Sequence, residues 1–447
     1  MSRATSDPSL AYQPPAFCSP YKAGVLRSAF DHLIPGRVAG FHDLGIDLVM
    51  GEREGYRFKD VDGQEYLDFH LNGGVFTLGH RNPELTAILR ASLDSLDIGN
   101  HHFPSAARAD LAETLARVAP GDLPYTVFST GGSEAIDVAI KSARYATKRR
   151  KIVALDVAYH GRTGLSGSAG DDATAAFFHS DSPAEFLKAP FEDTVALENL
   201  LSQEDVAAVI IETIPATYGF ITPSLRYLPK IKELCEKYGS LFIADEIQAG
   251  LGRTGHMWAV SVWNVRPDIL VTAKGLSGGL YPIAATLLSR RVGAWLSENG
   301  WGHVSSYGGA EIGCAVAKRV LELCSNPKNL SHALEISDHL GAGLADIQSR
   351  HPYLKAVHRQ GLVMGLQFDN PRGGVDMMKA LYDRGLWAIF AGFNSSILQF
   401  KPGFLVDKAY CDEALGLVED AIQVAEKQPK GHAVRLVSGG RSVAGSL

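Results

Sequence analysis

The sequence predicts an α/β protein in which a large domain built on a mainly parallel sheet is accompanied by a smaller α+β domain. Between about residues 125 and 288, short runs rich in Val, Ile, Leu and Ala alternate with stretches of helical periodicity. This alternation is typical of parallel strands that helices cover on both faces. Beyond residue 325, longer helical stretches flank shorter apolar runs. The chain has 447 residues, of which 46% are hydrophobic, so both parts can bury a core.

Apolar runs of strand length are expected to form the large sheet, namely 125–129, 152–155, 207–212, 241–245, 269–273 and 283–288. Between them, apolar residues recur at helical spacing over 133–147, 226–238 and 313–323. An alternation over 55–69, broken by Asp62-Gly63, predicts a hairpin. In the C-terminal part we expect helices over 331–350, 374–384 and 410–426 and strands over 362–368 and 397–400.

The same pattern predicts the division of the chain. The large domain is expected over residues 76–325 and the C-terminal part of the small domain over 326–430. Residues 21–75, which contain the hairpin, are expected to join the small domain. Residues 1–20 are rich in Pro and Ser and are expected to form an irregular arm, and residues 431–447 lack apolar periodicity and are expected to form a flexible tail.

Composition excludes several classes of protein. The net charge is −6 and the basic run 148–151 is short, so we expect neither nucleic acid nor an anionic membrane as a partner. No apolar stretch has the length of a membrane span, and the N-terminus does not resemble a signal peptide. The five cysteines are scattered and form no C-x-x-C pair, which favours a reducing compartment, a cytoplasmic location and no metal site.

Candidate functional residues follow the strands, because ligands of such sheets bind beyond the carboxyl ends of the strands. Gly132 and Ser133 open a helix where small residues let backbone N–H groups meet a phosphate, although a plain turn capped by Ser133 fits equally. Asp245 ends an apolar strand, and a buried carboxylate there needs a cationic or hydrogen-bonded partner unless it caps a helix. Lys274 follows the next strand. In a partly desolvated pocket its amine can attack a carbonyl, whereas an ordinary lysine would extend to solvent.

A phosphate cradle, an acid for a ring nitrogen and a lysine for a Schiff base are what a pyridoxal 5′-phosphate (PLP) site must supply. The stretches Asp245–Gly255 and Thr272–Gly279 resemble those of the class III (ω-type) aminotransferase family, which has the fold type I of PLP enzymes. The resemblance extends from Gly55 to about Glu426. It implies that Lys274 holds PLP as a Schiff base and moves the proton, and that Asp245 keeps the pyridine nitrogen protonated. It also implies a homodimer with active sites shared between subunits.

The resemblance implies further cofactor contacts, which are Gly132 and Ser133 for the phosphate, Tyr159 for stacking on the ring, Glu212 and Gln248 beside the ring, and Ser306 for the phosphate bound by the partner subunit. The family has Thr at the position of Ser306. His160 either supports the site or is a core histidine.

Two departures from the family concern the substrate. Gln399 stands where the family has an Arg that binds the substrate α-carboxylate, and Lys401, two residues further along the strand, compensates only in part. Thr217 stands where a second Glu neutralises that Arg. The other substrate candidates, for which packing is the alternative role, are Phe76, His101, His102 and Tyr218.

The first hypothesis is therefore an aminotransferase that moves an amino group between an amine or amino acid and a keto or aldehyde acceptor. Because the Arg and the second Glu are missing together, the chain also resembles the PLP phospho-lyase branch of the family. A PLP lyase or epimerase acting on an amine with an anionic group such as phosphate is the alternative. A noncatalytic PLP-binding protein is a third reading, although it would not need Lys274 and Asp245. The glycine fingerprint of a dinucleotide-binding enzyme is missing from the sequence.

Overall fold

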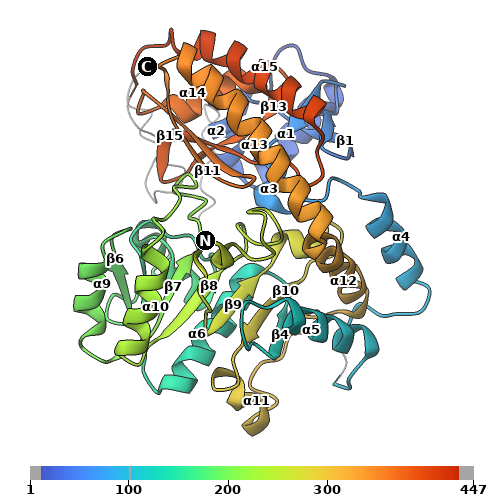
Figure 1. Cartoon of the computed structure of the whole chain (residues 1–447). Coiled ribbons are helices and arrows are strands. Elements are labelled where there is room, and N and C mark those ends of the chain that lie inside the picture. The colour runs from blue at the N-terminus through green and yellow to red at the C-terminus, as the bar shows by residue number, and fades with distance from the viewer. Residues whose placement is uncertain (1–11, 100–101, 432–447) are drawn as a thin grey trace, which may run out of the picture.

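The computed structural model of the protein describes residues 12–99 and 102–431, so most of the expected arm and tail lie outside the described residues. Within this part of the chain, three sheets and their helices form the expected α/β fold (Figure 1). No helix of the described residues is long and apolar enough to cross a membrane.

The largest sheet has seven strands in the order β4-β10-β9-β8-β7-β5-β6. The strands are β4 (Tyr125–Ser129), β5 (Lys151–Leu155), β6 (Phe186–Ala189), β7 (Val206–Glu212), β8 (Leu241–Asp245), β9 (Ile269–Thr272) and β10 (Ala284–Leu288). Strands β5 to β9 pair in parallel, whereas β10 runs antiparallel to both β4 and β9. The expectation of a mainly parallel sheet is thus confirmed.

The central strands are apolar along their whole length because helices cover the sheet. Every residue of β7, β8, β9 and β10 is buried. Helix α6 (Gly132–Thr147) packs against β8, β9 and β10, and α10 (Tyr227–Lys237) packs against β7 and β8. This burial on both faces explains why these strands read as continuous apolar runs and not as alternating ones.

There are two smaller four-stranded sheets, of which the first joins N-terminal strands to a C-terminal one and the second is built from the C-terminal part alone. One has the order β1-β2-β3-β13 and the other β11-β12-β15-β14. Their strands are β1 (Met50–Glu54), β2 (Arg57–Asp60), β3 (Glu65–Asp68), β11 (Leu354–Gln360), β12 (Val363–Phe368), β13 (Leu386–Trp387), β14 (Ile389–Ala391) and β15 (Asn394–Phe400). The expected hairpin is β2–β3, and β3 pairs in parallel with β13, so the blue and the red segments lie together in Figure 1.

The remaining α-helices are α1 (Pro20–His32), α2 (Pro35–Asp43), α3 (Leu71–Gly74), α4 (Pro83–Ser92), α5 (Ala106–Val118), α7 (Gly164–Ala169), α8 (Asp172–Phe177), α9 (Thr194–Leu201), α11 (Trp295–Glu298), α12 (Glu311–Ser325), α13 (Pro327–Arg350), α14 (Gly373–Tyr382) and α15 (Lys408–Ala425). Helix α13 begins four residues before the predicted start at 331. Asn326 caps it by accepting a 2.9 Å hydrogen bond from the Lys328 amide, and Pro327 occupies the first helical position, where its missing N–H costs nothing.

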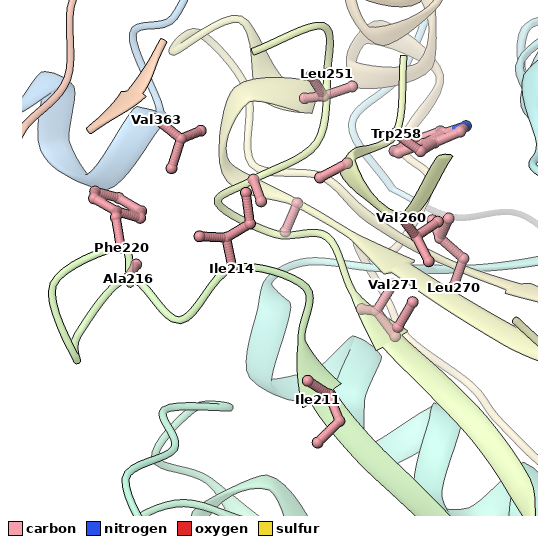
Figure 2. Close-up of a cluster of buried hydrophobic side chains, with 14 of the residues drawn as sticks. Ile211, Ile214, Ala216, Phe220, Leu251, Trp258, Val260, Leu270, Val271 and Val363 are labelled. Atoms are coloured by element: carbon pink, nitrogen blue, oxygen red, sulfur yellow. The ribbon is translucent and has the colours of Figure 1, made fainter. Parts of the chain in front are cut away.

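The loop after β7 connects the large sheet to the smaller one. Figure 2 shows Ile214, Ala216 and Phe220 along this loop, and Val363 of β12 in the same apolar cluster. A Cβ atom added at Gly365 of β12 would lie 2.0 Å from the Gly219 carbonyl oxygen, so only glycine permits this approach. The close contact fixes the position of the β12–β15 pair relative to the carboxyl end of β7.

Candidate active site

A cavity of about 460 Å³ lies beyond the carboxyl ends of β4, β7, β8 and β9. This is the place where ligands bind in open α/β sheets. Most of the residues that the sequence predicts to hold a cofactor line this cavity, namely Gly132, Ser133, Tyr159, His160, Glu212, Asp245, Gln248 and Lys274. The structure therefore brings together residues that are up to 142 positions apart in the sequence, from Gly132 to Lys274.

Lys274 is the first residue of the short 3-10 helix η3 (Lys274–Ser277), which directly follows β9. Its φ of 45° is in the left-handed region, which costs a non-glycine residue about 1–3 kcal/mol. Burial lowers the pKa of its amine; Asp245 and Glu212 oppose this effect, while the charge of Arg253 adds to it. The lowered pKa increases the fraction of free amine, which is the form that attacks a carbonyl.

Asp245 ends β8 with its carboxylate almost fully buried at the cavity wall. Its Oδ1 accepts a 3.0 Å hydrogen bond from the Ile247 amide, and its Oδ2 lies 2.8 Å from His160 Nδ1. His160 is buried as well, and its Nε2 has no hydrogen-bond partner among the described residues. His160 thus contacts the proposed acid directly and fixes its orientation, as a supporting residue would.

Glu212 joins two segments of the cavity wall. Its carboxylate oxygens accept hydrogen bonds from the amides of Tyr159 (3.0 Å) and Ala216 (3.2 Å). Burial raises the pKa of Glu212 to about 7, with His160 lowering it and Asp245 raising it further. Glu212 therefore orders the segment that carries Tyr159.

The first turn of α6 forms a cradle for an anion. Gly131 caps this 16-residue helix, so its N-terminal amides and dipole face the cavity. A Cβ atom at Gly132 would lie 2.9 Å from Ile247, and one at Gly161 would lie 2.3 Å from Ser133 Oγ. Ser133 Oγ also accepts a 3.3 Å hydrogen bond from the Arg162 amide. Glycine is needed at Gly161, whose φ of 127° and close approach to Ser133 exclude a side chain, whereas at Gly132 the Ile247 side chain would have to shift.

These residues fit PLP. The cradle suits a phosphate, Asp245 suits a protonated ring nitrogen, and Lys274 suits an aldehyde. The buried Gln248 Oε1 has no hydrogen-bond partner in the described part of the chain, and such an atom at a cavity wall calls for a ligand. Among residues 12–99 and 102–431, no cluster of three or more His, Cys, Asp or Glu side chains is placed to hold a metal ion.

The two residues at the position of the missing arginine lie behind the cavity wall. Gln399 and Lys401 are 7% and 1% exposed, and neither lines the cavity. Lys401 Nζ donates a 2.7 Å hydrogen bond to Gln399 Oε1 and lies 5.4 Å from the centre of the Phe220 ring. Burial lowers the pKa of Lys401 well below its ordinary value, and Arg253 and Lys274 lower it further.

The other substrate candidates also lie outside the cavity wall. Phe76 packs on His80 with ring centres 4.0 Å apart, and Tyr218 contacts Phe191 edge to face at 6.0 Å. Thr217 is partly buried in the loop after β7, and its carbonyl accepts a hydrogen bond from the Phe393 amide.

The last three candidates are His101, His102 and Ser306, and none of them is found at the cavity wall. His102 is exposed and meets Trp301 edge to face, while His101 lies outside the described residues. Ser306 does not line the cavity.

Sequence reasoning missed Arg162, which lies three residues after Tyr159, the predicted stacking residue. Its guanidinium lies 4.8 Å from the centre of the Tyr159 ring, and its Nη1 donates a 2.7 Å hydrogen bond to Asp171 Oδ2. A cation over the face of an aromatic ring is attracted by its electrons. Arg162 thus supports Tyr159, and only its place directly after the Tyr-His-Gly run could have indicated this.

Sequence reasoning gave no role to Glu246, the acid that follows Asp245. Glu246 points away from it and is fully buried. Its oxygens accept hydrogen bonds of 2.7 Å from the Thr213 hydroxyl, 2.8 Å from the Ala259 amide and 2.7 Å from the Val260 amide. The carboxylate therefore anchors the start of the 3-10 helix η2 (Ala259–Trp263) to the sheet.

The Glu246→Gln variant is expected to have a weaker dependence of stability on pH. Burial raises the pKa of Glu246 from 4.5 to about 7, so the folded protein holds this proton more tightly than the unfolded chain does. The free energy of unfolding then falls by roughly 3 kcal/mol as the pH rises from 4.5 to 7. Glu212 contributes to the slope in the same window, so the variant should lose only part of it. Urea unfolding of the apoprotein between pH 4.5 and 8 measures it, and an unchanged slope would contradict the assignment.

Comparison with known proteins gives a consistent result. The class-III aminotransferase family matches residues 42–422. An uncharacterized aminotransferase from Archaeoglobus fulgidus is 40% identical over 91% of this chain and 96% of its own length. Putrescine aminotransferase from Pectobacterium atrosepticum is 34% identical over 81% of this chain and 80% of its own length. The structure of ornithine aminotransferase from Toxoplasma gondii, with PLP at partial occupancy in its active site, superimposes with a TM-score of 0.79 at 26% identity, covering 86% of this chain and 91% of that one.

Proposed function

The chain belongs to the class III aminotransferase family and is a PLP-dependent aminotransferase, and we propose that its amino donor is the terminal amine of a small aliphatic substrate. When bound, PLP supplies an electron sink that makes a proton on the neighbouring carbon acidic. The residues of this chain provide the rest. Lys274 is the amine that takes up and returns that proton, and Asp245 provides a buried negative charge in the wall of the same cavity.

The pairing of Gln399 with Lys401 carries the proposal. An α-carboxylate beside the reacting carbon needs a cation in fixed geometry, which Arg provides best. Of the two residues at that position only Lys401 carries an amine, and this amine already donates to Gln399 Oε1 behind the cavity wall. Lys401 is therefore not free to bind an α-carboxylate, and no arginine of the described residues lines the cavity.

The wall of the cavity that remains open to a substrate is mainly apolar. It includes Val75, Ile214, Leu280, Tyr281 and Pro282. Such a wall favours a methylene chain and helps to exclude water from the amine of Lys274. The similarity to a putrescine aminotransferase and to an ornithine aminotransferase, both named for substrates with a terminal amine, supports the same donor class.

Steady-state kinetics with a panel of donors tests this proposal. With pyruvate as acceptor, we expect kcat/KM for putrescine and other terminal amines to exceed that for alanine and glutamate at least about tenfold, which is the discrimination that one mismatched group typically gives. The Gln399→Arg variant, combined with Lys401→Met so that two cations are not buried together, should improve the use of α-amino acids. A wild-type preference for α-amino acids would contradict the proposal.

We also propose that the enzyme is a homodimer with shared active sites and that it works in the cytoplasm. Ser306 lies outside the cavity of its own chain, as a residue that serves a partner would. The large apolar side chains near it in sequence are strongly exposed, with Trp301 at 68%, Val304 at 62% and Tyr307 at 54%. Exposed apolar groups of this kind mark interaction surfaces. All five cysteines are free, which supports a reducing compartment.

A further inference from the structure

Glu134 lies in the first turn of α6, directly after the phosphate cradle. Its Oε2 accepts two hydrogen bonds from Thr130, at 2.8 Å from the amide and 2.7 Å from the hydroxyl. Thr130 and Gly131 form part of the cavity wall. One oxygen of Glu134 therefore fixes the strand-to-helix turn on which the cradle is built.

The other oxygen of Glu134 faces a different segment, the loop His303–Gly309 that carries Ser306. His303 Nε2 lies 3.3 Å from Glu134 Oε1, and Ser305 donates a side-chain hydrogen bond to the same carboxylate. Although burial acts to raise it, the pKa of Glu134 is lowered overall by hydrogen bonds from Thr130 and Ser305 and by the nearby His303. The group thus stays a carboxylate and holds donors from two separate segments at once.

The segment before this loop is also tied to α6. Lys141 Nζ donates a 2.8 Å hydrogen bond to the Gly302 carbonyl, and Trp295 Nε1 donates a 3.1 Å hydrogen bond to Ser142 Oγ. At the far end of the loop, a Cβ atom at Gly309 would lie 2.8 Å from the Phe128 ring, and its φ of 71° favours glycine. Between these fixed ends, Glu134 contacts the loop at His303 and at Ser305, and Ser305 is the residue directly before Ser306.

We propose that Glu134 is a positioning residue that joins the phosphate cradle of its own protomer to the loop by which Ser306 reaches the phosphate site of the partner subunit. The proposal rests on the shared-site homodimer proposed above. It follows that the affinity of each site for PLP depends on a carboxylate in the other subunit, although that carboxylate contacts neither the cofactor nor the substrate of the partner.

Heterodimers with one subunit carrying Lys274→Ala test this proposal, because only the other subunit can then give the visible absorption band of PLP bound to Lys274. In the first arrangement, Glu134→Gln is placed on the Lys274→Ala subunit, where it can act only across the interface. In the second arrangement, Glu134→Gln is placed on the subunit with intact Lys274. The dissociation constant of PLP is read from the visible band during titration. In the first arrangement we expect it to rise about tenfold, the loss typical of a hydrogen bond to a charged group.

Two matched variants in the first arrangement make the outcome specific. His303→Asn, placed on the Lys274→Ala subunit, leaves the Thr130 contacts in place and should weaken PLP binding across the interface. Ser306→Ala should weaken it to a similar extent as Glu134→Gln. Circular dichroism and sedimentation check that each heterodimer is folded and assembled.

The results separate this inference from the proposal on which it rests. If Ser306→Ala weakens binding across the interface and Glu134→Gln does not, Glu134 has no role in positioning the loop and the inference is wrong. The same holds if Glu134→Gln weakens binding only within its own subunit. If neither variant acts across the interface, or if no dimer forms, the shared-site proposal is wrong and the inference falls with it.

Discussion

The Lys274→Ala variant is expected to lose the visible absorption band of the bound cofactor and all measurable turnover. Lys274 is the one lysine at the cavity wall among the described residues, and its burial provides the free amine that the reaction needs. Removing the reactive group of a site that acts as a unit typically costs at least about 10⁴-fold in kcat. Absorbance spectra with excess PLP and turnover with the best donor measure both effects.

The matched control is Lys318→Ala, which removes a half-exposed lysine of α12 that pairs with Asp110 on the surface. This variant should keep the band and the activity of the wild type. A visible band or turnover that persists in Lys274→Ala would contradict the assignment of Lys274.

The Asp245→Asn variant is expected to retain PLP but to lose at least about 100-fold in kcat. Asp245 is a buried carboxylate held by His160 and by the Ile247 amide, and asparagine keeps this shape without the charge. Taking one charge from a buried ion pair costs about 3 kcal/mol or more, which corresponds to at least 100-fold in rate.

The comparison of kcat with the dissociation constant of PLP distinguishes this role from a structural one. A role in holding a proton on the ring requires kcat to fall much more than PLP affinity does. The surface variant Asp122→Asn, at a position paired with Arg290 and 69% exposed, should change neither value. An Asp245→Asn enzyme with nearly normal kcat would contradict the role given to this carboxylate.

The fold was predictable from sequence where burial on both faces makes a strand continuously apolar. The runs that became β7 and β8 were found because each is long, apolar and followed by a turn. The short edge strand β6 and the half-exposed β11 were missed, since their residues are only partly buried and carry no such signal. The antiparallel direction of β10 was not predictable either, because an apolar run reads the same in both directions.

The candidate site was predictable to the extent that it follows from topology. Parallel strands bring their carboxyl ends together, so Asp245 and Lys274 could be expected in one cavity. The role of Glu246 was not predicted, because its contacts with Thr213 and with the start of η2 depend on tertiary packing. The contacts of Glu134 with His303 depend on tertiary packing between segments 169 positions apart, which no local pattern contains.

The most direct test of amino transfer by this chain is a spectrum of the wild-type enzyme mixed with putrescine in the absence of any keto acid. We expect the visible band to disappear in a single stoichiometric step, with one carbonyl product formed per active site and no free ammonia, and pyruvate to restore the band. If the band persists instead while ammonia accumulates over many turnovers, the enzyme releases the amino group of the substrate as ammonia. The aminotransferase account is then contradicted.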